Sequence, residues 1–206
     1  MAVGRILTGL VILGFLCAAP VAAHAQSSGS SQQAADFVRD ASKRAVALVA
    51  EQDHAQLYDL IQQTFDFDAI GKFALGRSWQ AATTEQRAEY QRAFLAATSQ
   101  MYADRLAAEK GATLKVRGAR PGAGPAEYLV AAEIRRGSGE SMDIDLKVRD
   151  GATGMKIVDV LSEGVSMQIT QRSDFAAVIR RQGVDGLISQ LKARSTTMEA
   201  SASAAR

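Results

Sequence analysis

The segment VLSEGVS at residues 160–166 contains two serines beside a glycine, an arrangement that can present a nucleophile on a turn. A catalytic serine needs a base to take its proton, and the hydrolase pattern Gly-x-Ser-x-Gly places that serine between a strand and a helix. Ser162 and Ser166 do not match this pattern. The candidate base, His54, lies in an early predicted helix with no obvious acidic partner. We therefore expect no enzyme activity, although an exported hydrolase is one alternative.

Residues that could bind a metal ion are also few. The chain has one cysteine, Cys17, and two histidines. Removal of an N-terminal signal would leave His54 as the single imidazole and no thiol, so zinc sites lack their usual ligands. Asp66 and Asp68 form a close acidic pair but lack the oxygen-rich loop of a calcium site. We interpret Asp66 as a helix cap and predict no metal and no cofactor.

The first 25 residues have the features of a signal peptide. An apolar run follows Arg5, and Ala23-His24-Ala25 has the small-x-small pattern that signal peptidase cleaves. The apolar run is shorter than the roughly 20 residues that cross a membrane as a helix. We expect cleavage after Ala25 and a periplasmic location.

Composition is that of an ordinary globular domain. Of 206 residues, 47% are hydrophobic and 22% are charged, with a net charge of +2. No long run of one charge appears, so nucleic acid is not an expected partner. We expect a flexible lead-in at 26–32, a single domain at 33–194 and a disordered tail at 195–206.

The spacing of apolar residues predicts helices in the first half of the chain, followed by a sheet. Apolar residues at helical spacing indicate a helix over 33–49, one capped by Asp53, one over 68–75 that Gly76 ends, and a long one that Thr83 and Gln86 begin as a capping box. Alternating polar and apolar residues then predict four strands, near 114–117, 127–134, 142–148 and 155–161. Turn residues between them favour an antiparallel meander.

Two more helices are expected at the C-terminal end. Ser173 or Asp174 is the predicted cap of the first, which Gly183 ends, and Asp185 is the predicted cap of the second. The expected fold class is α+β: N-terminal helices, a four-stranded antiparallel meander, and C-terminal helices packed on one face of the sheet with an apolar cavity between.

Two blocks of sequence resemble one protein family. Residues 64–102 contain Phe-Asp, Ala-Leu-Gly-x-x-Trp and Ala-Thr-x-Glu-Gln in order, and the second block contains KIVDV, EGVS, Arg-Ser-x-Phe and Gly-Leu-Ile between 156 and 188. Both are similar to the MlaC or toluene-tolerance family of periplasmic lipid carriers, over nearly the whole chain after residue 37. Many members carry Asn-Tyr before the Arg-Ser, whereas this chain has Thr170-Gln171.

The resemblance implies a shuttle that carries one phospholipid between the inner and outer membranes, with its acyl chains buried between sheet and helices. It also implies an inner-membrane ABC transporter with an MCE-domain ring and an outer-membrane lipoprotein complex as partners. A branch of the family associated with hopanoid biosynthesis is similar as well, so a hopanoid carrier working with a resistance-nodulation-type exporter is the alternative. A non-lipid periplasmic adaptor or chaperone with a filled core is a third possibility.

The predicted lipid contacts come from the inner sheet face and from the region after Gly164. Arg172 lies in the second motif block, and its guanidinium suits a lipid phosphate or a hinge. Trp79 is interpreted as a structural anchor. The predicted lipid-binding residues are Tyr128, Val130, Ile144, Leu146, Ile157, Val165, Met167, Ile169, Phe175 and Ile179.

Overall fold

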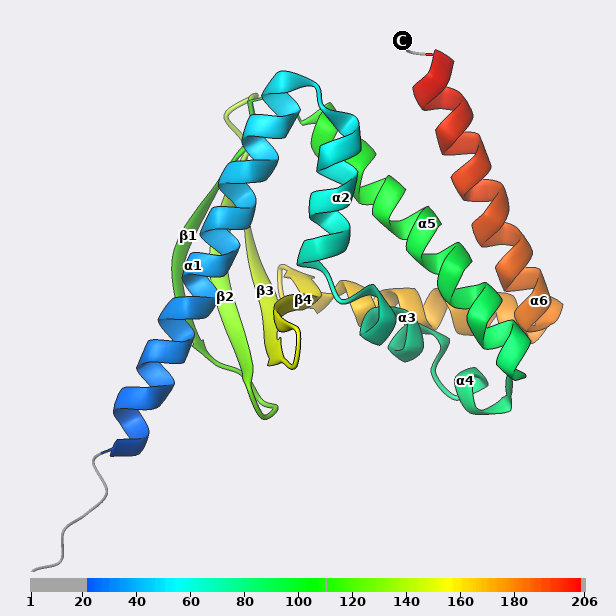
Figure 1. The fold of residues 1–206 in the computed structure, drawn as a ribbon, viewed down its shortest axis with the longest axis horizontal. Helices are drawn as coiled ribbons and strands as arrows, with labels where there is room; N and C mark the ends of the chain where they lie inside the picture. Colours follow the sequence, from blue (N-terminus) through cyan, green and yellow to red (C-terminus); the bar gives the residue numbers. More distant parts are fainter. Residues whose placement is uncertain (1–21, 110, 205–206) are drawn as a thin grey trace, which may run out of the picture.

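A computed structural model describes residues 22–109 and 111–204, with side chains described over 30–109 and 111–196 (Figure 1). The predicted signal peptide lies almost entirely outside these residues. The helices are α1 (Ala22–Glu51), α2 (His54–Thr64), α3 (Phe67–Leu75), α4 (Ser78–Ala81), α5 (Thr84–Ala108) and α6 (Met167–Ala204). The strands are β1 (Thr113–Pro121), β2 (Glu127–Arg135), β3 (Ser141–Gly151), β4 (Gly154–Ser162) and β5 (Val165–Ser166).

The sheet is an antiparallel meander in the order β1-β2-β3-β4-β5. It has five strands, so the prediction of four was wrong. The additional strand follows a two-residue turn in which Glu163 (φ 52°) and Gly164 (φ 79°) both have positive φ, the conformation that a tight hairpin turn of this twist requires. Glutamate seldom adopts positive φ, so a Glu-Gly pair is a weak signal for a hairpin turn.

One face of the sheet packs against α1, as Figure 1 shows. The buried residues of this cluster, which we call the sheet core, come from α1 and from β2, β3 and β4. They are Ala34, Val38, Val130, Ala132, Ile144, Leu146, Val148 and Ile157. The small side chain of Ala34 is fully buried, so the α1 backbone can approach the strands closely.

A second cluster, which we call the helical core, lies among the helices to the side of the sheet. It includes Leu57 and Ile61 of α2, Phe67 of α3, Phe94 of α5 and Phe175 of α6. The C-terminal half of α1 also packs against it. The C-terminal helix packs mainly against α5 and α3 and touches the sheet at β4 and β5, so it does not cover the sheet face as predicted.

Most of the predicted helix caps are confirmed. The carboxylates of Asp53 and Asp66 accept hydrogen bonds from the backbone N–H groups of Gln56 and Ala69, each 2.9 Å long. At the start of α5, the side chains of Thr83 and Gln86 accept reciprocal backbone bonds of 3.1 Å. These bonds satisfy N–H groups that the first helical turn leaves without partners.

The predicted caps of the C-terminal helices were wrong. α6 already begins at Met167, because Ser166 Oγ accepts from the Ile169 N–H and Asp159 accepts from the Gln168 N–H. Ser173 therefore lies inside the helix. The predicted stop is present as a kink at Gly183 (φ 71°, ψ −178°). The side chain of Asp185 accepts a hydrogen bond from Gln86 of α5.

Both segments predicted to be irregular have helical backbones. Residues 26–32, where a flexible lead-in was expected, form part of α1, and Ser31 is buried. Residues 195–204 continue α6, where a disordered tail was expected. Each segment extends a helix that tertiary contacts already hold, and extension costs far less than nucleation. Over the described residues, no helix combines the length and the apolarity needed to span a membrane.

Candidate functional site

Five predicted lipid-contact residues lie together on the sheet face under α1. Val130 has no exposed surface, and Ile144, Leu146 and Ile157 are at most 7% exposed. Tyr128 is half-buried and packs against the same cluster. The opposite sheet face carries ion pairs, in which hydrogen bonds from Arg117 and Arg149 lower the pKa values of Glu133 and Glu127 respectively. The sheet thus has one apolar and one charged face.

Two further predicted residues lie in the helical core. Phe175 of α6 is 5% exposed and packs edge-on against Phe94 and Tyr90 of α5, with ring centroids 6.1 and 6.3 Å away. Ile179 packs against the same core one turn later. Burial raises the pKa of Tyr90, whose hydroxyl donates to the Gly71 carbonyl at 2.9 Å. The structure therefore does not bring these two residues into the cluster of the sheet residues.

The remaining three apolar residues are at the surface, around the β4–β5 turn and the start of α6. Val165 is 55% exposed, Met167 38% and Ile169 62%. From the sequence, these three residues were predicted to contact lipid. In this structure none of them belongs to the sheet core or to the helical core. Their contact with lipid stays a prediction.

The two cores meet at Phe65, which packs against both. Its ring stacks on Tyr102 of α5 at 5.2 Å and on Phe67 at 5.8 Å. Next to it, the Asp66 N–H donates to the Ile157 carbonyl of β4 at 2.9 Å, so this junction is fixed to the sheet. Sequence reasoning did not select Phe65 or Tyr102 as site residues, although both lie in the first motif block.

Ser166, the candidate nucleophile, has a structural role. Its hydroxyl donates to the buried carboxylate of Asp159 at 2.6 Å and also caps α6. These bonds of Ser166 fix the β5–α6 connection in place. His54, the candidate base, is exposed at the first turn of α2.

Asp159 also acts on Tyr102 of α5. Burial, and to a lesser extent the charge of Asp159, raises the pKa of Tyr102.

Arg172 is a residue of α6 whose side chain packs against the end of α3. Its guanidinium stacks over the Phe73 ring at 5.0 Å. A Cβ atom at Gly76 would stand only 3.0 Å from Arg172 Nε, and Gly76 has φ 59°, so any larger residue there would meet both the guanidinium and backbone strain. The Lys72 ammonium and the Arg87 guanidinium both lie over the Trp79 ring, 5.7 and 5.6 Å from its centroid, in agreement with an anchoring role.

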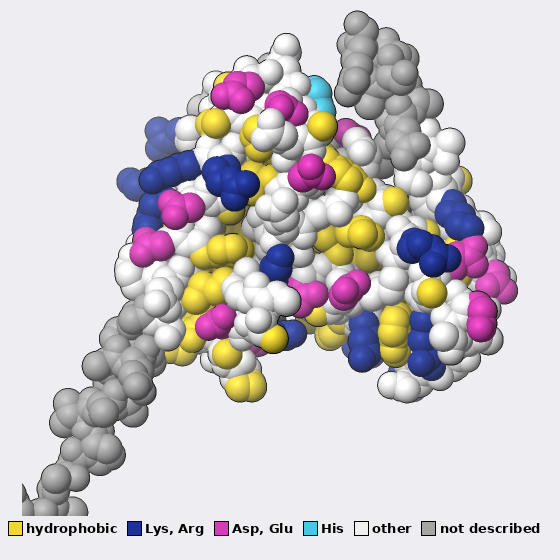
Figure 2. All heavy atoms as spheres, viewed as in Figure 1, with side chains coloured by type: hydrophobic (Ala, Val, Ile, Leu, Met, Phe, Trp, Pro, Cys, Tyr) yellow, Lys and Arg dark blue, Asp and Glu magenta, His cyan; other side chains and the backbone are white. Residues whose placement is uncertain are grey.

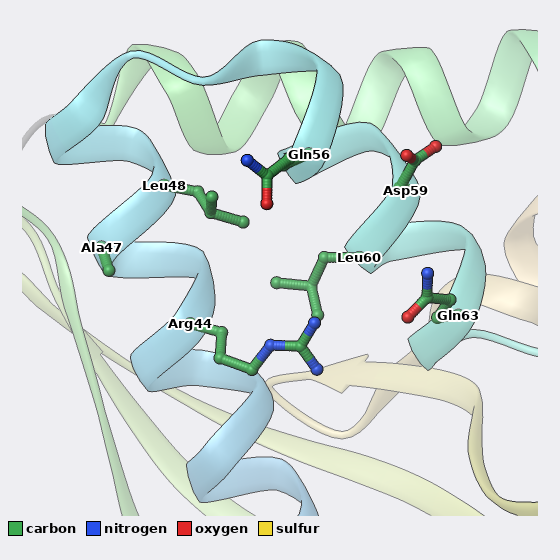
Figure 3. Close-up of a pocket in the computed structure, with 7 residues that line it drawn as sticks. All are labelled: Arg44, Ala47, Leu48, Gln56, Asp59, Leu60 and Gln63. Atoms are coloured by element: carbon green, nitrogen blue, oxygen red, sulfur yellow. The ribbon is translucent and has the colours of Figure 1, made fainter.

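A pocket of about 270 Å³ lies in the seam between α1 and α2 (Figure 3). Leu48 and Leu60, which are half-buried and buried, form its apolar floor, and its rim consists of exposed residues: Ala47 and the polar Arg44, Gln56, Asp59 and Gln63. Figure 2 shows hydrophobic side chains exposed in the zone between the sheet and the helices on the same face of the molecule. Pockets for drug-sized ligands commonly hold about 300–1,000 Å³, so this one is too small for a whole two-chain lipid.

No group of three or more histidine, cysteine or acidic side chains in the described part of the chain is arranged to hold a metal ion.

Comparison with known proteins agrees with the resemblance carried by the two motif blocks. A family model described as MlaC protein matches residues 31–193. Among solved structures, the chain is similar to a phospholipid-binding protein from Ralstonia solanacearum, determined in complex with a phospholipid, with a TM-score of 0.69 and 27% sequence identity. The match covers 80% of this chain and 97% of that one. Because the family model covers most of its residues, this protein belongs to the MlaC family.

Proposed function

We propose that this protein is a periplasmic shuttle that carries one phospholipid between the inner and outer membranes. Membership of the MlaC family and the likeness to a phospholipid-bound protein support a lipid-binding carrier. The observation that carries the proposal is the division of the interior into a sheet core and a helical core that share Phe65. Apolar chains placed between them would meet hydrophobic side chains on both sides.

The energetics of transfer favour a deep apolar site. Taking the roughly 15 methylenes of a 16-carbon chain out of water is worth about 0.8 kcal/mol each, so two chains represent on the order of 24 kcal/mol. A surface groove would leave much of that area in water. The five residues of the inner sheet face, Tyr128, Val130, Ile144, Leu146 and Ile157, are the proposed contacts on one side of the chains, with Phe175 and Ile179 on the other.

Loading requires the two cores to move apart, because their residues are closely packed here. The Asp66–Ile157 bond fixes the helices to β4 at one side, whereas α1 and α2 meet along a seam that already contains a pocket. Lipid chains entering along this seam would replace contacts between side chains by contacts with methylenes. Since both are apolar, the exchange between bilayer and protein is nearly balanced in free energy.

A balanced exchange has no direction of its own. In this proposal the direction comes from partner proteins: an inner-membrane ABC transporter with an MCE-domain ring, and an outer-membrane lipoprotein complex. A hopanoid is the alternative cargo, with a resistance-nodulation-type exporter as its partner. Arg172 remains a candidate for contact with a lipid head group, or for a hinge, at the α3–α6 contact.

Lipid uptake from vesicles tests the proposal. Delipidated protein is incubated with phospholipid vesicles, separated from them by size, and its bound phospholipid is measured by mass spectrometry. Stoichiometric phospholipid on the re-isolated protein is the expected result. Uptake of a hopanoid but no phospholipid from mixed vesicles would favour the alternative cargo, and uptake of neither would favour a non-lipid adaptor.

A further inference from the structure

The pocket between α1 and α2 combines a polar rim with an apolar floor, as an amphiphile requires. Gln56, Asp59 and Gln63 recur at intervals of three and four along α2, so they share one face of that helix. Arg44 reaches across from α1, and Figure 3 shows its guanidinium extending toward α2 below Leu60. The floor residue Leu60 is 4% exposed, and Leu48 packs against the helical core. These two leucines close the pocket on its inner side, so acyl chains pass inward only when the two side chains move apart.

The charged groups of the rim lack partners within the described residues. The guanidinium of Arg44 and the carboxylate of Asp59 take part in none of the ion pairs or side-chain hydrogen bonds of that part of the chain. The amide of Gln56 donates through Nε2 to Asp53 at 2.7 Å, which leaves its Oε1 as an acceptor. In Figure 3 this oxygen is turned toward the space between the helices.

From this arrangement we infer that the α1–α2 pocket is a head-group subsite that selects a zwitterionic phospholipid, with Arg44 binding the phosphate and Asp59 and Gln56 Oε1 binding the ammonium. A guanidinium pairs well with a phosphodiester, through two parallel hydrogen bonds. The ammonium of an ethanolamine head group matches the carboxylate and the amide oxygen. A head group without a cation leaves Asp59 unpaired beside the phosphate, and like charges repel.

This inference rests on the proposed function, because it assigns the head group of the lipid that the protein is proposed to carry. The chains would pass from the rim over Ala47, Leu48 and Leu60 into the interior. The pocket volume of about 270 Å³ is too small for a whole lipid but suits a head group alone.

Competition between two lipids tests the inference. Delipidated protein is incubated with vesicles of equimolar phosphatidylethanolamine and phosphatidylglycerol, and the lipids on the re-isolated protein are quantified by mass spectrometry. The wild type is expected to carry about threefold more phosphatidylethanolamine, the preference that an exposed ion pair can supply. Asp59→Asn is expected to bring the ratio close to that of the vesicles. Glu51→Gln, at the exposed end of α1 and outside the pocket, is the control and should keep the wild-type ratio.

Arg44→Gln is expected to lower total uptake about threefold or more, because it removes the phosphate contact. Arg44→Lys should recover part of that loss, since it keeps the charge but not the fork of donors. Lys43→Gln removes a neighbouring exposed charge outside the pocket and should leave uptake unchanged. All these positions are exposed, and thermal unfolding of each variant verifies that it folds.

A titration with inorganic phosphate and with glycerophosphoethanolamine, followed by calorimetry, separates a lipid subsite from a site for free phosphate. If Arg44→Gln weakens binding of inorganic phosphate but leaves lipid uptake intact, the pocket is a separate phosphate site and the inference is wrong. Unchanged ratios and uptake in Asp59→Asn and Arg44→Gln would overturn it while leaving the proposed function in place. If the wild type takes up no phospholipid, the proposed function fails and the head-group assignment fails with it.

Discussion

The sheet core depends on side chains such as Val130, which has no exposed surface in the middle of β2. In this structure the space around it is filled by protein, with Ala34 and Val38 of α1 in the same cluster. In the proposed loaded state, part of that protein contact is replaced by an acyl chain. Val130 would then contact protein side chains in the lipid-free state and an acyl chain in the loaded state.

Val130→Trp distinguishes these roles. The indole fills the space that an acyl chain would occupy, so we expect bound phospholipid per folded protein to fall to less than about half. Overpacking should lower the free energy of unfolding by about 1–3 kcal/mol. Val46→Trp on the exposed side of α1, where Val46 is 42% exposed, is the control and should change neither quantity. Unchanged lipid in folded Val130→Trp would exclude this residue from the lipid site.

Ser166 provides a second prediction at the scale of the residue. Because its hydroxyl caps α6 and bonds to Asp159, Ser166→Ala should lower the free energy of unfolding by about 1 kcal/mol. Ser173→Ala, at one of the two positions predicted from sequence as the cap, should change it by less than about 0.5 kcal/mol. Urea unfolding of both variants makes the comparison, and a larger loss for Ser173→Ala would contradict the assigned start of the helix.

At the scale of elements, the helices of the N-terminal half follow closely from local sequence. Asp53, Asp66 and Thr83 cap their helices as predicted, because these bonds form between residues three apart. The start of α6 could not be predicted in this way. Its cap includes Asp159, which lies on β4, nine residues before Gln168, and is brought next to it by the β4–β5 turn.

The predicted lipid-contact residues lie in two separate clusters, and here too the cause is a tertiary contact that local sequence does not encode. Alternation along the strands places Val130, Leu146 and their neighbours on one face, and that part of the prediction is confirmed as a shared cluster. Alternation does not say which helix covers that face. Phe175 belongs to the helical core because α6 packs on α5 and α3, a tertiary contact that no local pattern encodes.

The kink in α6 gives a prediction for this element. Gly183 combines φ 71° with ψ −178°, a region that only glycine adopts readily. Gly183→Ala should therefore cost about 1–3 kcal/mol of unfolding free energy, even though a Cβ atom there would meet no neighbour within 4 Å. Gly118→Ala, on β1 with equal open space and without positive φ, is the matched control. Equal stability of both variants by thermal unfolding would show that the kink carries no strain.

At the scale of the whole molecule, two apolar cores lie side by side where a domain of this size usually forms one. α1 contributes to both, with Ala34 and Val38 in the sheet core and Leu48 against the helical core. Phe65 and the Asp66–Ile157 bond join them at β4. In the proposed function, the two cores, joined by α1 and by this junction at β4, part to admit the acyl chains while each keeps most of its own contacts.

The most direct test of this account is the lipid content of the protein purified from the periplasm of a host cell, without added lipid or detergent. Organic extraction and mass spectrometry give the amount of each lipid per protein chain. The account predicts a stoichiometric amount of phospholipid, released when the protein is unfolded. Protein that is folded and carries no lipid, and that takes up none from vesicles, would contradict it.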